Sequence, residues 1–319
     1  MTSPKLHLPD QCVMLTRRCG GRAYLIRPDD FINQTIAFEV GKAAERHNQS
    51  VHAVVAMSNH IHMGNTDRTA KRSRFMQDTM SAIARTRNRD LDRRGHFWEA
   101  GSYGDTVLLD RDAIERKLLY IWLNPVQAGL VRRAEDWPGF MILPRHWGKT
   151  IRVEKPDRFY GRKNPEYIEF TPEPPPGYED MSLEEVIAYF EELLRFGEDE
   201  IAELRAEAGL PVVGAEKVCQ MDPMDCPTTP DRRSRINPRF ATTNGRLLAQ
   251  AIQEYQAFRQ EYYKCRRQWL RGAKGVVFPS GTVALRRLAP VKCGRPAADH
   301  PCLFPRGGQR RGPVENDVA

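Results

Sequence analysis

The chain lacks several features that would assign it to a common class of protein. Its 319 residues contain no run of about 18 apolar residues, so we expect no transmembrane helix. The first ten residues contain no apolar stretch of the kind found in secretory signal peptides. The seven cysteines are odd in number and form no Cys-x-x-Cys pair, which disfavours both a zinc ribbon and a disulfide framework. We therefore expect a cytoplasmic protein that does not bind a membrane.

Acidic charge is scarce relative to basic charge, and it is unevenly distributed. The 49 Lys and Arg against 41 Asp and Glu leave a net charge of +8. Residues 1–150 carry 23 basic and 16 acidic side chains, net +7, and residues 211–319 carry 19 and 9, net +10. Between them, residues 181–210 carry 2 and 9, net −7. The two basic blocks predict a polyanionic partner such as nucleic acid, although charge alone leaves a merely solvated surface as the alternative.

The predicted elements divide the chain into four segments. Residues 1–150 alternate strands with helices, which predicts an α+β domain. Residues 151–180 are rich in proline and charge and predict an extended linker. Residues 181–292 predict a mainly helical accessory region, in which Ser182 and Glu185 have the spacing of a capping box. Residues 293–319 are predicted to be a disordered tail.

Two histidines follow a turn after the β-branched run 51–57. His60 and His62 are separated by one residue, and residues i and i+2 of a strand point to the same face. Two imidazoles on one face can share a divalent metal ion. A chance His-x-His pair is the alternative that this short motif leaves open.

A second pair of residues lies on the predicted helix 112–124. Tyr120 and Asn124 are four residues apart, so they lie on one helical face one turn apart. A tyrosine hydroxyl can act as a covalent nucleophile, and an amide oxygen can complete a metal site. Core packing of Tyr120 beside Leu118 and Trp122 is the alternative that this spacing allows.

Three blocks of sequence together resemble the REP-associated tyrosine transposases of the HUH single-strand transposase superfamily. That family shows an Asn-His-x-His turn, then a Gly-His-Leu-Trp segment, then a helix with the pattern Tyr-Ile-x-x-Asn-Pro-Val-x-Ala-Gly-Leu-Val. Here the blocks are VHAVVAMSNHIHM, GHFWE and KLLYIWLNPVQAGLV, in the same order and covering residues 5–150. The family's basic pattern after the Trp is replaced here by Glu99–Gly104.

The resemblance implies a fold and a reaction. The fold would be a ferredoxin-like antiparallel sheet with helices on one face, followed by a mainly helical C-terminal extension. Tyr120 would attack a phosphodiester of single-stranded DNA and form a 5′-phosphotyrosine. His60, His62 and Asn124 would hold Mg²⁺ or Mn²⁺. The partner would be DNA of palindromic repeat hairpins, bound in the nucleoid by a monomer or homodimer.

The DNA surface is expected to use exposed basic and aromatic side chains. Phosphate contacts supply affinity without sequence specificity, and exposed aromatic rings can stack on bases. The basic candidates lie in the predicted helix 71–94 and are Arg85, Arg87, Arg89, Arg93 and Arg94. The aromatic candidates are Phe97 and Tyr103, whereas Trp98 is expected to belong to the core. Tyr103 is also a second candidate nucleophile.

Three other functions remain open on the sequence. A domesticated, non-catalytic protein that binds hairpins or single-stranded DNA is favoured by the altered stretch Glu99–Gly104. A replication initiator with the same chemistry often carries helicase motifs, and no Gly-x-x-x-x-Gly-Lys-(Ser/Thr) motif occurs here. An unrelated metal hydrolase would use the His pair but would not require Tyr120.

Overall fold

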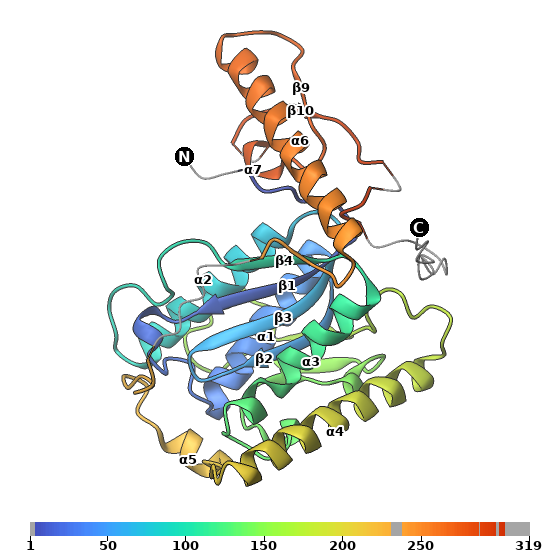
Figure 1. The fold of residues 1–319 in the computed structure, drawn as a ribbon. Coiled ribbons are helices and arrows are strands. Elements are labelled where there is room, and N and C mark those ends of the chain that lie inside the picture. The colour runs from blue at the N-terminus through green and yellow to red at the C-terminus, as the bar shows by residue number, and fades with distance from the viewer. Residues whose placement is uncertain (1–3, 231–237, 287, 298–299, 304–319) are drawn as a thin grey trace, which may run out of the picture.

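The computed structural model describes residues 4–230, 238–286, 288–297 and 300–303. Its centre is a six-stranded sheet of order β5-β2-β3-β1-β4-β8, in which only the β4–β8 pair is parallel (Figure 1). The strands of this sheet are β1 (Gln11–Arg18), β2 (Gln49–Ala56), β3 (His60–Asp67), β4 (Gly104–Leu108), β5 (Met141–Ile142) and β8 (Phe240–Ala241). The α-helices are α1 (Asp30–His47), α2 (Arg72–Asp90), α3 (Arg111–Gln127), α4 (Leu183–Glu207), α5 (Ala215–Gln220), α6 (Gly245–Leu270) and α7 (Val283–Arg286).

Helices cover both faces of the sheet. Val13 and Leu15 of β1 pack with apolar residues of α1 and α2 in one cluster, whereas Cys12 and Met14 pack with residues of α3 and α4 in another. The predicted α+β class is confirmed, but the expectation of helices on one face is wrong. Because the inner strands are apolar on both sides, each side requires a covering layer.

Residues 151–180 were predicted to be an extended linker, but residues 151–170 form a packed hairpin. β6 (Ile151–Glu154) pairs with β7 (Tyr167–Phe170) in antiparallel register. Ile168 and Phe170 are buried against α1, where Gly41 leaves the room that their side chains occupy. Buried apolar residues alternate with exposed ones along β7, as in a strand with one buried face. This alternation is only four residues long and lies in a highly charged segment, so the strand was not predicted from the sequence.

Side-chain hydrogen bonds mark the first turns of three long helices. The side chains of Asp29, Asp110 and Ser182 accept hydrogen bonds from the first turns of α1, α3 and α4, and the capping box of Ser182 with Glu185 is present. α3 ends at Gln127, two residues after Pro125, and Gly129 just beyond the helix takes a left-handed φ of 67°. Within the described residues, no helix is both long enough and apolar enough to span a bilayer.

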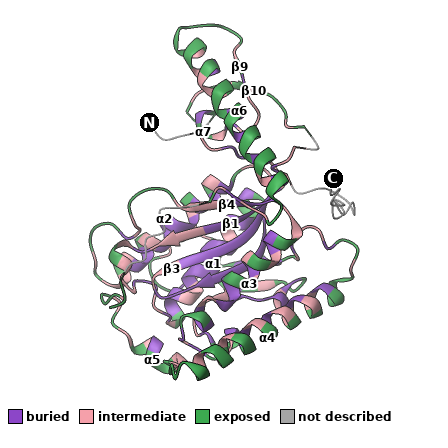
Figure 2. Ribbon diagram, viewed as in Figure 1, coloured by how far each residue is buried: buried purple, intermediate pink, exposed green. Residues whose placement is uncertain are grey.

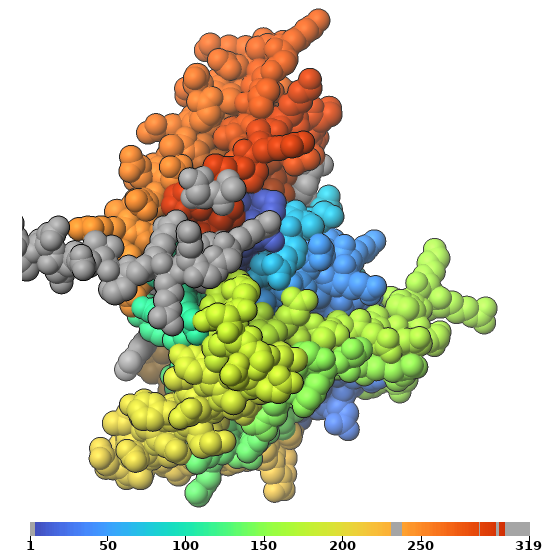
Figure 3. All heavy atoms as spheres, turned by 90° about the vertical axis from the view of Figure 1, so that its right-hand side faces the viewer, coloured from blue at the N-terminus to red at the C-terminus, as the bar shows by residue number. Residues whose placement is uncertain are grey.

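The C-terminal part of the chain extends the sheet and then projects from it. β8 pairs with β4, and the first half of α6 packs Leu247, Tyr255 and Phe258 into the cluster on the α1 and α2 side. The rest of α6 packs with β9 (Val277–Phe278) and α7, and β9 pairs with β10 (Lys292–Cys293). This segment stands at one end of the molecule (Figure 3), and exposed residues line the outer sides of α4 and α6 (Figure 2).

The predicted disordered tail lies mostly outside the described residues. Residues 298–299 and 304–319 are among those that the structure does not describe. Cys302 is described and buried, and its carbonyl accepts a hydrogen bond from Gln11 Nε2 at 3.1 Å. This contact ties the end of the described chain to the start of β1.

Candidate active site

The alternation of β3 divides its side chains between the two layers. Ile61 and Met63 belong to the cluster under α1 and α2. His60 and His62 therefore point to the opposite face, which α3 covers. Gly64 lies on that same face, and a Cβ atom there would stand 2.5 Å from Leu118 Cδ2 of α3. The absence of a side chain at Gly64 lets α3 lie close to β3.

α3 presents two polar side chains to the end of β3 that carries the histidines. Its apolar side is anchored by Leu118, Ile121 and Trp122, which are all fully buried. Trp122 Nε1 also donates a hydrogen bond to the Ile142 carbonyl at 2.8 Å, which fixes the rotation of the helix against the sheet. Tyr120 is not a core residue, because 39% of its surface is exposed.

The four predicted residues converge at this point. The rings of His60 and His62 are 4.7 Å apart between centroids, and the rings of His62 and Tyr120 are 5.3 Å apart. His60 Nε2 lies 3.3 Å from Asn124 Oδ1. Two strand residues and two helix residues, about 60 positions apart in the chain, thus form one cluster that is open to solvent at Tyr120.

Hydrogen bonds from neighbouring residues orient both imidazoles. Asn59 Nδ2 donates to the Arg22 carbonyl at 3.0 Å, which turns Asn59 Oδ1 toward His60 Nδ1 at 2.7 Å. Thr16 Oγ1 lies 2.7 Å from His62 Nδ1. These contacts occupy the Nδ1 atom of each ring and leave Nε2 available, as is usual for histidine ligands of metals.

Both imidazoles are neutral at pH 7. Burial, together with the positive charge of Arg18, lowers the pKa of His60 to about 4. Burial also lowers the pKa of His62 well below its ordinary value, and the charges of His60, Arg18 and Lys117 add to this effect. A neutral imidazole can donate a nitrogen lone pair to a metal, so neither ring has to lose a proton first.

The site has a donor set that fits a divalent cation. His60 lies between two amide oxygens, with Asn59 Oδ1 at 2.7 Å from Nδ1 and Asn124 Oδ1 at 3.3 Å from Nε2. A neutral ring has one N–H and can donate to only one of these oxygens, so a cation at the other nitrogen would satisfy the two remaining acceptors. Within the described part of the chain, no cluster of three or more His, Cys, Asp or Glu residues could hold a metal. A cation in this site would therefore lack a carboxylate ligand.

The surroundings of the cluster are basic. Arg18 lies opposite His60 in the β1–β3 register, and Thr16 lies opposite His62. Lys117 Nζ lies 5.7 Å from the centroid of the Tyr120 ring. Positive charge with no nearby carboxylate ligand favours an anionic substrate such as a phosphodiester.

The predicted DNA-binding arginines fall into three groups. Arg87 is 2% exposed, and its guanidinium donates to Asp29, Asp90 and the Leu25 carbonyl. The prediction of a DNA contact at Arg87 is therefore wrong, because its hydrogen bonds hold α2 to α1 and the preceding loop. Arg93 donates to Asn88 and to the His96 carbonyl.

The remaining three arginines are exposed. They are Arg85, Arg89 and Arg94. α2 lies on the opposite face of the sheet from α3 (Figure 1), so Arg85 and Arg89 are separated from Tyr120 by the sheet. Sequence spacing placed them on a helix but did not indicate which side of the sheet that helix covers.

The aromatic candidates near the Gly-His-Phe-Trp segment belong to the core. Phe97 is buried, and Trp98 Nε1 donates to the Met80 carbonyl at 2.8 Å. The hydroxyl of Tyr103 lies 3.2 Å from Ser73 Oγ. Burial and the charge of Asp105 raise the pKa of Tyr103 well above its usual range. Phe97 is therefore not available for base stacking, and the half-buried ring of Tyr103 already has Lys5 Nζ 4.0 Å from its centroid. The raised pKa also makes Tyr103 a poor nucleophile.

Sequence reasoning missed three residues of the site. Thr16 and Arg18 reach it only through the pairing of β1 with β3, which no local pattern reveals. Lys117 lies three residues before Tyr120, and helical spacing alone places the two on one face.

Comparisons with known proteins give one match. No family model and no curated protein matches the sequence. Among solved structures, the chain is similar to a REP-associated tyrosine transposase bound to a REP hairpin, with 16% sequence identity and a TM-score of 0.39. The match covers 46% of this chain and 84% of the other. A score of this size establishes neither family nor function, so the functional assignment rests on the geometry of the cluster around Tyr120.

Proposed function

We propose that the protein is a metal-dependent tyrosine DNA transposase that cuts and rejoins single-stranded DNA at palindromic repeat hairpins in the bacterial nucleoid. The observation that carries the proposal is the convergence of Tyr120 with His60, His62 and Asn124 at one solvent-accessible point. A nucleophile, a metal donor set and two flanking cations are the parts that phosphodiester cleavage without a nucleotide cofactor requires.

The proposed chemistry uses each residue in a defined role. His60 Nε2, His62 and Asn124 Oδ1 would hold Mg²⁺ or Mn²⁺, which when bound supplies Lewis-acid polarisation of a phosphate oxygen. Tyr120 Oη forms a bond to phosphorus while the bond from phosphorus to the 3′ oxygen breaks. The phenol proton leaves to solvent, and the 3′ oxygen gains a proton. Arg18 and Lys117 stabilise the negative charge that develops during the attack.

The linkage formed in this step is reversible. The 5′-phosphotyrosine conserves the energy of the phosphodiester bond, so a 3′-hydroxyl of another strand can attack it and restore Tyr120. Asn59 and Thr16 act as positioning residues, because they hold the two imidazoles with Nε2 toward the reacting groups.

A covalent-adduct assay tests the proposal. Purified protein, Mn²⁺ and labelled single-stranded DNA carrying the hairpins that flank the gene are mixed and separated on a denaturing gel. We expect label to migrate with the protein, and Tyr120→Phe, His60→Ala and His62→Ala each to abolish the adduct. Tyr167→Phe is the matched control, because Tyr167 is similarly exposed, at 43%, and lies on β7 beyond α1.

The outcome also decides between catalysis and binding alone. Hairpin binding without an adduct would reject the transposase and support the domesticated, non-catalytic DNA-binding protein. An adduct that survives Tyr120→Phe would refute the assignment of the nucleophile.

A further inference from the structure

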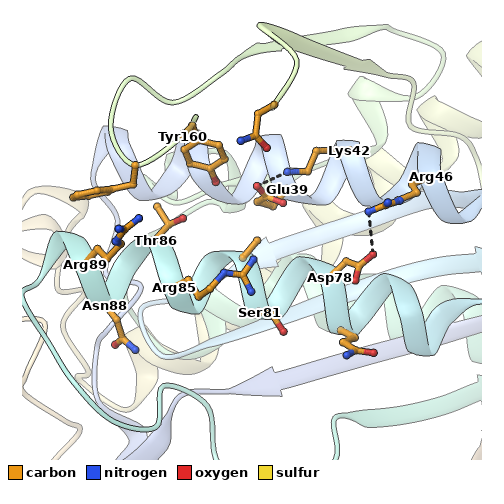
Figure 4. A pocket seen from close by; sticks show the side chains of 14 residues that line it. Glu39, Lys42, Arg46, Asp78, Ser81, Arg85, Thr86, Asn88, Arg89 and Tyr160 are labelled. Carbon is orange, nitrogen blue, oxygen red and sulfur yellow. Dashed lines mark hydrogen bonds and ion pairs between the residues drawn. The ribbon is translucent and has the colours of Figure 1, made fainter. Parts of the chain in front are cut away.

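A groove lies between α1 and α2, on the opposite face of the sheet from Tyr120. Its volume is about 660 Å³, and residues 159–164 of the loop between β6 and β7 close one side of it. Lys42 and Arg46 reach it from α1, while Arg85 and Arg89 reach it from α2 (Figure 4). Tyr160 forms part of its wall, where its ring packs edge-on against Phe38 at 5.4 Å.

The groove has an excess of positive charge that its own acids do not neutralise. Lys42 pairs with Glu39 at 2.6 Å, and Arg46 pairs with Asp78 at 3.6 Å (Figure 4). Neither Arg85 nor Arg89 has a carboxylate within ion-pairing distance among the described residues. These two arginines are four residues apart in α2, so their guanidinium groups extend from the same helical face one turn apart.

An exposed aromatic ring stands beside these arginines. Phe159 is 44% exposed and lines the groove. The Arg89 guanidinium lies 5.7 Å from its centroid, and Phe31 packs edge-on against it at 6.0 Å. The backbone φ of Phe159 is 69°, which is unfavourable for a residue with a side chain. The backbone therefore holds a large apolar ring at the rim in a strained conformation, an arrangement that often accompanies a binding site.

We propose that this groove binds a segment of single-stranded nucleic acid. Arg85 and Arg89 contact successive phosphates, and an unpaired base stacks on Phe159. This combination of a cationic groove with a stacking ring is how proteins hold single strands without reading sequence. A duplex keeps its bases paired inside, so it cannot offer a base to Phe159. The site is separate from Tyr120 and needs no metal.

Equilibrium binding to the full-length protein tests the proposal. The probe is a labelled single-stranded DNA of mixed sequence that forms no hairpin, with EDTA present, and RNA of the same sequence is a second arm. We expect the double variant Arg85→Gln/Arg89→Gln to bind at least about tenfold more weakly. The slope of log affinity against log salt should become shallower by about 1.4, since two phosphate contacts are lost.

A variant without a charge change separates stacking from electrostatics. Phe159→Leu keeps an apolar contact with Phe31 but removes the aromatic face. We expect binding to weaken about fivefold or more while the salt slope stays unchanged. Arg195→Gln on α4 is the matched control for charge, because Arg195 is exposed in a different helix and should have no effect. All three arginines are exposed, so these variants are expected to fold, and circular dichroism checks this.

Each result has a defined meaning. Weakened binding of DNA, RNA or both by the groove variants but not by Arg195→Gln supports the proposal. Unchanged affinity and slope in the double variant overturns it, as does equal competition by a mononucleotide, which would indicate a small phosphate pocket. Because binding is measured without metal, the two proposals are tested separately. The groove variants can leave binding unchanged while Tyr120 still forms an adduct, and binding in the groove can be supported when no adduct forms.

Discussion

The close approach of α3 to β3 at Gly64 predicts that even one added methyl group disturbs the site. In Gly64→Ala the new Cβ would stand 2.5 Å from Leu118 Cδ2, 3.5 Å from Ile121 Cδ1 and 3.6 Å from Ala53 Cβ. Leu118 is fully buried, so its side chain can turn away only by displacing packed neighbours. We therefore expect α3 to move away from the strand, and Tyr120 to move with it, two residues further along α3.

The magnitude is set by two opposing contributions. Overpacking a dense core costs about 1–3 kcal/mol. Replacing glycine by alanine recovers about 0.4–1 kcal/mol, because the unfolded chain loses conformational freedom. We expect a net loss of about 1–2 kcal/mol in the free energy of unfolding. The rate of adduct formation by folded protein should fall about tenfold or more, since a shift near 1 Å removes much of the benefit of positioning.

Urea unfolding and the adduct assay measure the two effects. Leu118→Ala relieves the contact, so the double variant Gly64→Ala/Leu118→Ala should be at least about 1 kcal/mol more stable than the sum of the single changes predicts. Gly41→Ala is the control, because its Cβ meets Ile168 and Phe170 at 2.5 Å on the opposite face. It should affect stability without changing the rate. Unchanged stability in Gly64→Ala, together with additive effects in the cycle, would refute the reasoning.

Three further predictions concern charge and ligands. Burial lowers the pKa of His52 from 6.5 to about 4. The unfolded state therefore binds the extra proton first as pH falls below about 6.5, and between pH 7.5 and pH 5 the wild type should lose about 2 kcal/mol more than His52→Gln in urea unfolding. Arg87→Met should lose about 1–3 kcal/mol in the same measurement, because the Leu25 carbonyl loses its donor while Asp29 and Asp90 keep ion pairs with Arg27 and Arg158. Arg94→Met should change stability by less than about 0.5 kcal/mol. Asn124→Asp supplies the missing carboxylate, so Mn²⁺ measured by electron paramagnetic resonance without DNA should bind it about tenfold or more tightly than wild type, while His62→Ala should bind less than wild type. Equal pH slopes, equal costs of the two arginine changes, or unchanged Mn²⁺ affinity would each contradict the corresponding argument.

Local spacing determined much of the candidate site from the sequence. His60 and His62 share a face because a strand alternates every residue, and Tyr120 and Asn124 share a face because a helix repeats every 3.6 residues. The capping-box spacing of Ser182 and Glu185 marked the start of α4 for an equally local reason, since Ser182 accepts a hydrogen bond from the first turn of its own helix. Such relations span only a few residues, so the sequence carries them directly.

Other features depended on contacts between distant segments. The register that sets Thr16 opposite His62 arises from the pairing of two whole strands. The burial of Arg87 depends on Asp29, which belongs to another part of the chain. Helices cover both faces of the sheet, and the hairpin with Ile168 and Phe170 covers α1, because apolar surface must be buried. Which segment covers which surface depends on the fit of side-chain shapes as well as on composition.

Features that depend on residues close together in the chain could thus be predicted from the sequence, and features that depend on distant segments could not. The sequence by itself determined which residues share a face of a strand or helix, and it predicted the candidate site residues from that. Only the tertiary structure decided that α3 brings Tyr120 and Asn124 to the histidines, and that Arg85 and Arg89 lie behind the sheet beside Phe159. The positions of these helices depend on how many side chains pack together against both faces of the sheet, and the pattern of no single segment contains that information.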